Sequence, residues 1–370
     1  MRTKISLGLM GNEPRQEHLF SSLKAACEKT IRLPFDEIDL MSKYTAAALS
    51  LSWPRSEWWQ NYQMHPIIQR RRKKVLLANL RNVQDEIDAL LMWGSWFNPN
   101  PSKGRPLPFF NYIDQSYSLE NLPGEKKGRF ARRQRAHSMQ TDCYLQSSKI
   151  FCMSKWARDQ TLSSHDIDPG KVVAVGWGPC AIDLSSEPAS FGGREPIVLH
   201  VSNDFKRKGV DYLIDTARLV REELPETRFV VIGKDNGSID VSECADVEFL
   251  GPIYDPKQLS GYFRKASVFF MPHRFDRSPH VLVEAMSAGL PLVATAQGGA
   301  IELIDGTGTG LLCAGGDLVE YSNAILTLLR DDGKRSEMGQ CGLQLSKTYY
   351  NWAAVARRIM SGIESVIKAY

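Results

Sequence analysis

Residues 271–295 read MPHRFDRSPHVLVEAMSAGLPLVAT and carry the clearest secondary-structure signal in the chain. An apolar run ends at Pro272, and a polar loop follows it. Ser278 and Pro279 then predict a helix start, because serine is a preferred N-cap and proline is tolerated at the first helical position. Gly289 ends that helix. A second apolar run follows at once, so the pattern predicts a strand, a loop, a helix and another strand.

Two carboxylates flank the N-terminus of this predicted helix. Asp276 lies in the loop, and Glu284 follows eight residues later. A helix N-terminus presents unpaired N–H groups and the positive end of the helix dipole, which favour an anion such as a diphosphate. Carboxylate oxygens accept hydrogen bonds from sugar hydroxyls. The arrangement therefore suits a nucleotide diphosphate sugar.

The composition indicates a globular protein of two domains, with 370 residues, 43% of them hydrophobic and 24% charged. The seven cysteines include no C-x-x-C pair. They favour neither a disulfide framework nor a zinc site, and they fit a reducing compartment. No apolar run approaches the roughly 18 residues that a membrane span needs. We therefore expect a cytoplasmic protein, either free or peripheral on the inner face of the membrane.

Strands and helices alternate through the second half of the chain, which predicts a parallel sheet covered by helices. Ligands of such sheets bind at the carboxyl ends of the strands. Several polar or small residues follow predicted strands there and should share one edge: Lys208, Gly233, Gly251, Asp276, Gly298 and Gly299. The first half also reads as α/β. We expect one domain over 1–187, completed by a helix over 349–370, and a second over 195–348.

Four motifs occur in the order of a known family. Residues 276–286 (DRSPHVLVEAM) resemble its Glu-x7-Glu motif, and 204–209 (DFKRKG) its Lys-Gly diphosphate loop. Residues 291–302 (PLVATAQGGAIE) resemble its Pro-Val-Val-Ala…Gly-Gly…Glu segment, and 154–157 (SKWA) its Ser-x-Trp-Ala segment. The chain therefore resembles the retaining GT-B glycosyltransferases of family 4. The resemblance implies two facing Rossmann-like domains with a central cleft and a C-terminal crossover helix.

The implied activity is transfer of a sugar from a nucleotide diphosphate sugar to the hydroxyl of a glycan or lipid-linked acceptor, without a metal or other cofactor. Cell-surface polysaccharide or glycolipid synthesis is the expected setting. The implied catalytic residues are Asp276, Lys208 and Asp114. The implied donor-binding residues are Glu284, Asn203, Arg207, Gly233, Gly251, Ser278, Pro279, His280, Val281, Gly298 and Gly299. Gly11 and Asn12 are expected on the acceptor side.

Three positions depart from the family pattern. Asp276 replaces a glutamate and has a shorter reach, Asn203 stands where an arginine is common, and the first loop begins Gly11-Asn12 without a Gly-Gly pair. Asp114 occupies a strand end where related enzymes often carry a histidine. Two rival functions stay open: a GT-B epimerase or phosphorylase, which would form product without an acceptor, and a non-catalytic nucleotide-sugar-binding subunit.

Two basic runs, 70–74 and 126–135, lie in the first half together with Trp53, Trp58 and Trp59. They are either solvated helix faces or a surface for anionic lipid, which tryptophan at a membrane interface would support. No nucleic-acid-binding module accompanies the charge, so we expect no nucleic-acid partner. Lys208 is expected at the start of a helix, where a cation opposes the dipole unless an anion is bound.

Overall fold

The computed structural model describes residues 5–10, 16–27, 29–33, 66–94, 97–100, 106–118, 127–182, 194–234, 237, 239 and 244–369. The chain divides into two compact units. The first contains Met1–Val175 and Ala356–Tyr370, and the second contains Gly176–Val355. The units meet at 175/176 and 355/356, whereas the sequence-based domains end at 187 and resume at 195 and 349; residues 183–193 lie outside the described residues.

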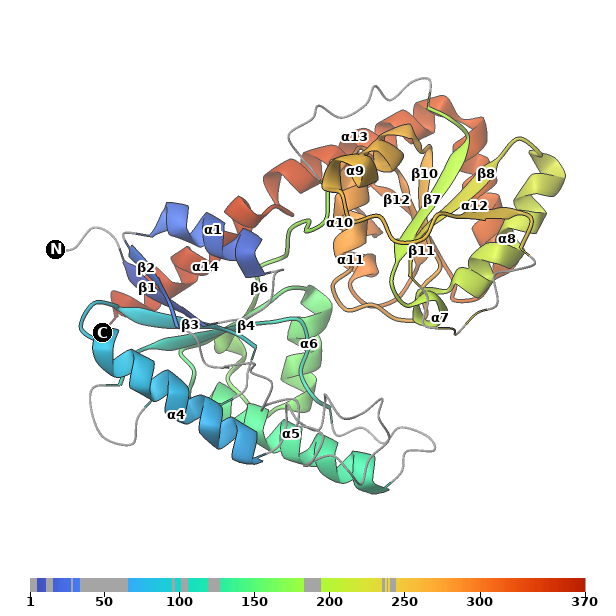
Figure 1. The fold of residues 1–370 in the computed structure, drawn as a ribbon. Coiled ribbons are helices and arrows are strands. Elements are labelled where there is room, and N and C mark those ends of the chain that lie inside the picture. Colours follow the sequence, from blue (N-terminus) through green and yellow to red (C-terminus); the bar gives the residue numbers. More distant parts are fainter. Residues whose placement is uncertain are drawn as a thin grey trace. The chain divides into compact units, whose positions relative to one another are not determined.

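The first unit is built on a parallel sheet with the strand order β2-β1-β3-β4-β5-β6 (Figure 1). Its elements are β1 (Ser6–Met10), α1 (Gln16–Ala26), β2 (Lys29–Arg32), α4 (Pro66–Val83), β3 (Ala89–Trp93), β4 (Phe109–Ile113), α5 (Lys127–Gln146), β5 (Lys149–Cys152), α6 (Lys155–Ser164), η2 (Pro169–Lys171) and β6 (Val172–Ala174). The parallel order requires helical crossovers, because the end of one strand must return to the start of the next.

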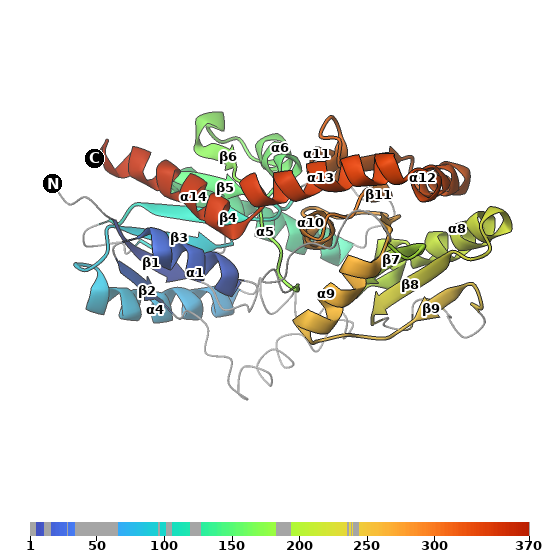
Figure 2. The ribbon, with the colours of Figure 1, turned by 90° about the horizontal axis from the view of Figure 1, so that it is seen from above.

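The second unit has a parallel sheet with the order β12-β11-β10-β7-β8-β9. Strands β7, β8 and β9 of this sheet can be followed in Figure 2. Its elements are β7 (Ile197–Ser202), α7 (Phe205–Lys208), α8 (Val210–Glu223), β8 (Arg228–Gly233), β9 (Val247–Phe249), α9 (Pro256–Lys265), β10 (Val268–Met271), α10 (His280–Ser287), β11 (Leu292–Thr295), α11 (Ala300–Ile304), β12 (Gly310–Cys313), α12 (Leu318–Arg330) and α13 (Asp332–Thr348). The two sheets confirm the predicted α/β class.

Helices cover both faces of the second sheet, as two neighbouring residues of β10 show. Successive strand residues point to opposite faces. Phe269 stacks on Phe263 of α9 with ring centroids 5.7 Å apart, whereas Phe270 meets Tyr321 of α12 at 5.2 Å. Strands buried on both faces read as continuous apolar runs, which is why the sequence of β10 does not alternate.

The last helix, α14 (Trp352–Ile367), begins in the second unit and continues into the first. In the first unit Ile359 and Ile363 are fully buried, and the Arg358 Nε donates to the Val175 carbonyl oxygen at 2.7 Å. A Cβ placed on Gly362 would come within 2.6 Å of the Phe151 ring. The helix therefore packs closely against β5. No helix in the described part of the chain is long and apolar enough to span a membrane.

The two strand ends that matter most for the site approach each other at Gly209, between α7 and α8. Gly209 has φ +74°, and a Cβ there would lie 1.8 Å from the Pro272 carbonyl oxygen. Only a residue without a side chain fits both conditions. This contact brings the loop after β10 against the α7–α8 turn.

We expect Gly209→Ala to lower the free energy of unfolding by about 2 kcal/mol or more, through left-handed strain and the clash with Pro272. The matched control is Gly261→Ala inside α9, where an added Cβ meets nothing within 4 Å. That change should stabilise by up to about 1 kcal/mol. Urea unfolding of both variants checks this, and equal effects would contradict the packing argument.

Candidate active site

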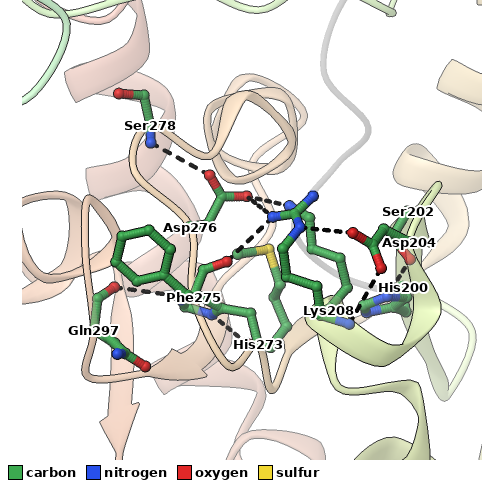
Figure 3. Close-up of polar contacts among 11 residues, drawn as sticks. His200, Ser202, Asp204, Lys208, His273, Phe275, Asp276, Ser278 and Gln297 are labelled. Carbon is green, nitrogen blue, oxygen red and sulfur yellow. Dashed lines mark hydrogen bonds and ion pairs between the residues drawn. The ribbon is translucent and has the colours of Figure 1, made fainter. Parts of the chain in front are cut away.

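The centre of the site is an ion pair between Lys208, at the end of α7, and Asp276, in the loop between β10 and α10 (Figure 3). The Lys208 Nζ donates to Asp276 Oδ2. Both side chains are nearly buried, at 11% and 15% exposed. The other carboxylate oxygen of Asp276 accepts from the Ser278 main-chain N–H at 3.3 Å. The predicted meeting of these two strand ends is therefore present.

Lys208 owes its position to a short capped turn. Asp204 is the N-cap of α7 and accepts from the Arg207 main-chain N–H. The helix ends at Lys208, and Gly209 separates it from α8. Lys208 therefore lies just before the start of α8, as expected, and it is also the last residue of the short helix α7.

Arg207 brings a second positive charge to the same carboxylate. Its Nη1 lies 3.7 Å from Asp276 Oδ2 and donates to the Phe275 carbonyl oxygen at 3.1 Å. Its Nε donates to Asp204 Oδ2 at 2.8 Å. The arginine is about half exposed, so it is accessible to a ligand in a way that Lys208 is not.

The electrostatics of the pair follow from burial and charge. Burial alone would raise the pKa of the Asp276 carboxyl, but the charges of Lys208 and Arg207 outweigh it and hold that pKa below its ordinary value. Burial lowers the pKa of the Lys208 ammonium, and the attraction of Asp276 opposes this shift. Asp276 is therefore ionised at neutral pH, and its negative charge is what keeps a buried ammonium in place.

Two buried histidines, His273 and His200, lie near the ion pair (Figure 3). The two ring nitrogens of His273 each lie 3.1 Å from a carbonyl oxygen, those of Met271 and Gln297. His200 Nε2 lies 2.8 Å from Ser202 Oγ. Burial lowers the pKa of His273, and it brings the pKa of His200 down to about 4, so the His200 ring is neutral at pH 7.

Arg274 anchors the other side of the same loop. Its guanidinium forms a two-pronged bond with the Asp211 carboxylate at 2.7 Å and lies over the Tyr212 ring, 4.2 Å from the centroid. It also donates to the Lys206 carbonyl oxygen. These bonds tie the loop to the start of α8. Residues 211 and 274 are far apart in sequence, so no local pattern could have identified the contact.

The predicted glycines take structural roles around the pair. Gly298 has φ +62°, and an added Cβ would lie 1.9 Å from the Asp276 carbonyl oxygen. Gly299 donates its N–H to that same oxygen at 3.0 Å. At Gly233 an added Cβ would lie 1.6 Å from the Ser202 carbonyl oxygen. The glycines therefore allow neighbouring strand ends to meet at the edge that carries Asp276.

Glu284 is buried in α10, at 4% exposed. Its Oε1 accepts from the main-chain N–H groups of Cys180 and Ala181 at 3.0 and 2.9 Å. His280 Nδ1 lies 2.7 Å from the Gly178 carbonyl oxygen. The sequence indicated Glu284 as a donor-binding residue and gave no sign of these contacts with a segment a hundred residues earlier.

The start of α10 differs from the prediction. The helix begins at His280 with Pro279 as the cap, so Ser278 and Pro279 are not the N-cap and first helical residue. No side chain caps this terminus. The Ser278 Oγ is buried and has no hydrogen-bond partner among the described residues. A buried hydroxyl without a partner is costly, which makes this oxygen a candidate ligand contact.

The remaining predicted residues lie near the pair or in the other unit. Asn203 is exposed after β7, and Gly233 donates its N–H to the Gly251 carbonyl oxygen at 2.9 Å. Val281 is half-buried in the first turn of α10. Asp114 is exposed at the end of β4 in the first unit. Gly11 and Asn12 lie outside the described residues.

Within the described ranges, no three His, Cys, Asp or Glu side chains come together as metal ligands. Asp168, in the Asp-x-Asp sequence at 166–168, instead caps the short helix η2 by accepting from the Gly170 N–H at 2.9 Å. Lys208 and Arg207 place two cationic groups beside Asp276.

Part of the chain is similar in sequence to known proteins. Residues 195–331 match the family model for glycosyl transferases group 1. The chain is 31% identical over 171 residues to sulfoquinovosyl transferase SQD2 of Arabidopsis thaliana, covering 45% of this chain and 32% of that one. It is 26% identical over 189 residues to a GDP-mannose-dependent monoacylated alpha-(1-6)-phosphatidylinositol monomannoside mannosyltransferase of Corynebacterium glutamicum, covering 47% and 49%. The chain thus spans half or less of the length of these relatives.

A solved structure extends the likeness to both units. Sucrose-phosphate synthase from Thermosynechococcus elongatus is similar with a TM-score of 0.70 and 17% identity, over 99% of this chain and 100% of that one. At that identity the likeness shows the fold alone. Together with the two parallel six-stranded sheets, it shows the GT-B fold.

The burial of the Lys208–Asp276 pair predicts how much each partner contributes to the free energy of unfolding. We expect Asp276→Asn and Lys208→Met each to lower the free energy of unfolding by about 3 kcal/mol, because each leaves a buried charge without its partner. The double variant should lose much less than the sum. The exposed pair Arg218–Asp215 is the control, and its removal should cost less than about 1 kcal/mol. Additive losses at 208 and 276 would show that the two charges are not coupled.

Proposed function

Because residues 195–331 match the family model for glycosyl transferases group 1, we propose that the protein is a retaining glycosyltransferase that moves a sugar from a nucleotide diphosphate sugar to an acceptor hydroxyl. The observation that carries the proposal is the buried Lys208–Asp276 pair at the carboxyl ends of β7 and β10. A cation and a carboxylate placed together at the ligand edge of a parallel sheet are what a leaving diphosphate and a sugar require.

Lys208 acts on the leaving group. Negative charge develops on the diphosphate as the glycosidic bond breaks, and a fixed ammonium stabilises that charge without reorganisation. Arg207 adds a second, more exposed cation. It takes the place of the arginine that the family often has at the position that Asn203 occupies here. With these two cations at the diphosphate, the reaction needs no metal ion.

Asp276 acts on the sugar. Its carboxylate holds sugar hydroxyls and supports the positive charge that develops at the anomeric carbon. A single carboxylate of this kind need not become the nucleophile. The leaving phosphate oxygen takes the proton of the acceptor hydroxyl on the face from which it departs, so the anomeric configuration is retained.

The nucleotide lies along the edge formed by α10 and the glycine turn. Glu284 accepts hydrogen bonds from the ribose hydroxyls, and the unpartnered Ser278 hydroxyl donates to a phosphate oxygen. Main-chain groups at Gly298 and Gly299 come close to the ligand because no side chain blocks them. Asn203, Gly233, Gly251, Pro279, His280 and Val281 complete the proposed donor-binding set.

The acceptor belongs to polysaccharide or glycolipid synthesis. The named relatives support this class, since one is a sulfoquinovosyl transferase and the other acts on a phosphatidylinositol mannoside. Asp114, Gly11 and Asn12 are the proposed acceptor-side residues. An epimerase or phosphorylase would turn over a donor without an acceptor, which separates it from a transferase.

The test of the function is nucleoside diphosphate release from a panel of UDP-, GDP- and ADP-sugars. We expect Lys208→Ala and Glu284→Ala each to reduce release about 10- to 100-fold, because each removes a charged hydrogen-bond partner. Glu222→Ala, which changes an exposed glutamate of α8, is the control and should keep full activity. Near-normal turnover by either folded site variant would refute the assignment.

We also propose that the first unit binds an anionic membrane through α4. The exposed residues Ile67, Arg70, Arg71, Lys74 and Arg81 recur at helical spacing, and the helix contains no acidic residue. They form one stripe, whereas Arg72 of the same basic run is buried. A basic stripe with an exposed isoleucine suits a surface of anionic lipid. Trp53, Trp58 and Trp59 lie outside the described residues.

Liposome co-sedimentation tests this proposal. The triple variant Arg70→Glu/Arg71→Glu/Lys74→Glu should bind vesicles containing anionic lipid about 100-fold more weakly, at roughly 1 kcal/mol per basic residue. Wild-type binding should also weaken as salt rises. The control reverses three exposed lysines of the second unit, Lys257, Lys265 and Lys347. Equal sedimentation of wild type and the α4 variant would exclude α4 as the membrane surface.

A further inference from the structure

The beginning of the second unit is bonded to α10 through its main chain. In the segment 178–181, the Gly178 carbonyl oxygen lies 2.7 Å from His280 Nδ1. The N–H groups of Cys180 and Ala181 both donate to Glu284 Oε1. Two consecutive amides on one oxygen fix the direction of that carboxylate. The position of Glu284 therefore depends on where the segment 178–181 lies.

The same segment is held from the other side by the start of α14. The Trp352 indole N–H donates to the Pro179 carbonyl oxygen at 2.6 Å, and the contact is buried. A Cβ placed on Gly178 would come within 2.8 Å of the Trp352 ring, so the main chain packs directly on the indole. The Trp352 ring also lies 6.0 Å from the His280 ring.

We propose that Trp352 is a positioning residue for Glu284 and acts through the main chain of the segment 178–181. The indole fixes Pro179, and the next two amides orient the carboxylate. Trp352 does not touch the ligand itself. The inference rests on the proposed function, because Glu284 is the proposed ribose ligand. It adds that nucleotide affinity depends on a residue far from α10 in sequence.

The chemistry of a carboxylate allows both roles. A carboxylate has two oxygens and about four acceptor sites, so accepting two amides does not exhaust it. The amides hold the group at a fixed angle, and a ribose then binds without paying the cost of ordering a mobile side chain. Loss of the indole bond should release the segment and restore that cost. The loss would appear as weaker nucleotide binding in a protein that remains folded.

The decisive variant is Trp352→Phe, which keeps an aromatic side chain, removes the N–H donor to Pro179 and leaves a smaller ring beside Gly178. Its control is Trp156→Phe in α6 of the first unit. Isothermal titration with UDP, GDP and ADP identifies the nucleotide that wild type binds. We expect Trp352→Phe to weaken that binding about 5- to 10-fold and Trp156→Phe to change it less than about 2-fold. Unchanged affinity in Trp352→Phe overturns the proposal.

A double-mutant cycle separates positioning from general loosening. In the Glu284→Ala background the carboxylate is gone, so adding Trp352→Phe should weaken binding no further. A merely structural role of Trp352 would lower affinity by the same factor in both backgrounds, and that result would overturn the proposal.

Hydrogen exchange of the Cys180 and Ala181 amides needs no ligand and tests the inference independently. Exchange should be faster in Trp352→Phe and in Glu284→Ala than in wild type, and Glu284→Gln, which keeps an acceptor oxygen, should stay close to wild type. Unchanged exchange in Trp352→Phe refutes the positioning role. If wild type binds none of the three nucleotides while the exchange result holds, the proposed function fails and the positioning contact stands.

The rate at which the Cys180 thiol is alkylated tests the inference in the wild-type protein. It is half-buried, and Cys244 and Cys341 in the same unit are half-buried controls. A nucleotide that binds only the state with Glu284 in place should stabilise the segment against opening. We therefore expect the bound nucleotide to slow alkylation of Cys180 by N-ethylmaleimide about 3-fold or more, without slowing the two controls. Equal rates with and without the nucleotide would count against the coupling.

Discussion

A buried ammonium must have a negative partner, and this requirement organises the second unit. Lys208 would be unstable at its position if Asp276 did not reach it, so the loop after β10 has to lie against the end of α7. The surrounding features maintain that approach. Gly209 removes the side chain that would separate the two elements, Arg274 ties the loop to Asp211, and His273 ties it to Gln297. The same pair meets the needs of a diphosphate and a sugar, which links the fold to the proposed chemistry.

Much of the second unit could be predicted from sequence because its signals are local. The apolar run that ends at Pro272 is β10, and the predicted alternation of strands and helices is the one observed. Parallel topology then follows from alternation of strands and helices, and it places Lys208 and Asp276 at one edge. The predicted start of α10 was wrong by one residue, since Pro279 serves as the cap and Ser278 remains outside.

The contacts that orient the site could not be predicted, and the reason is distance along the chain. Glu284 bonds amides at 180 and 181, and Trp352 bonds Pro179, so the partners belong to segments with no common periodicity. His200 gave a weak signal, as a polar residue inside the apolar strand IVLHVS. Arg274 gave none, because an arginine after a strand is ordinary until Asp211 is known to face it. Sequence reasoning thus identified the groups proposed to meet the donor and missed those that hold them.

The division of the chain has a consequence for biosynthesis. The second unit is one continuous stretch, 176–355, whereas the first needs residues from both 1–175 and 356–370. The late residues are not peripheral, since Ile359 and Ile363 are fully buried and Gly362 lies directly on Phe151. Domains usually fold in the order in which the ribosome produces them. Here translation of the first unit begins before the second unit and ends after it. Until α14 has been made, the sheet of the first unit keeps an apolar face uncovered while the second unit is translated.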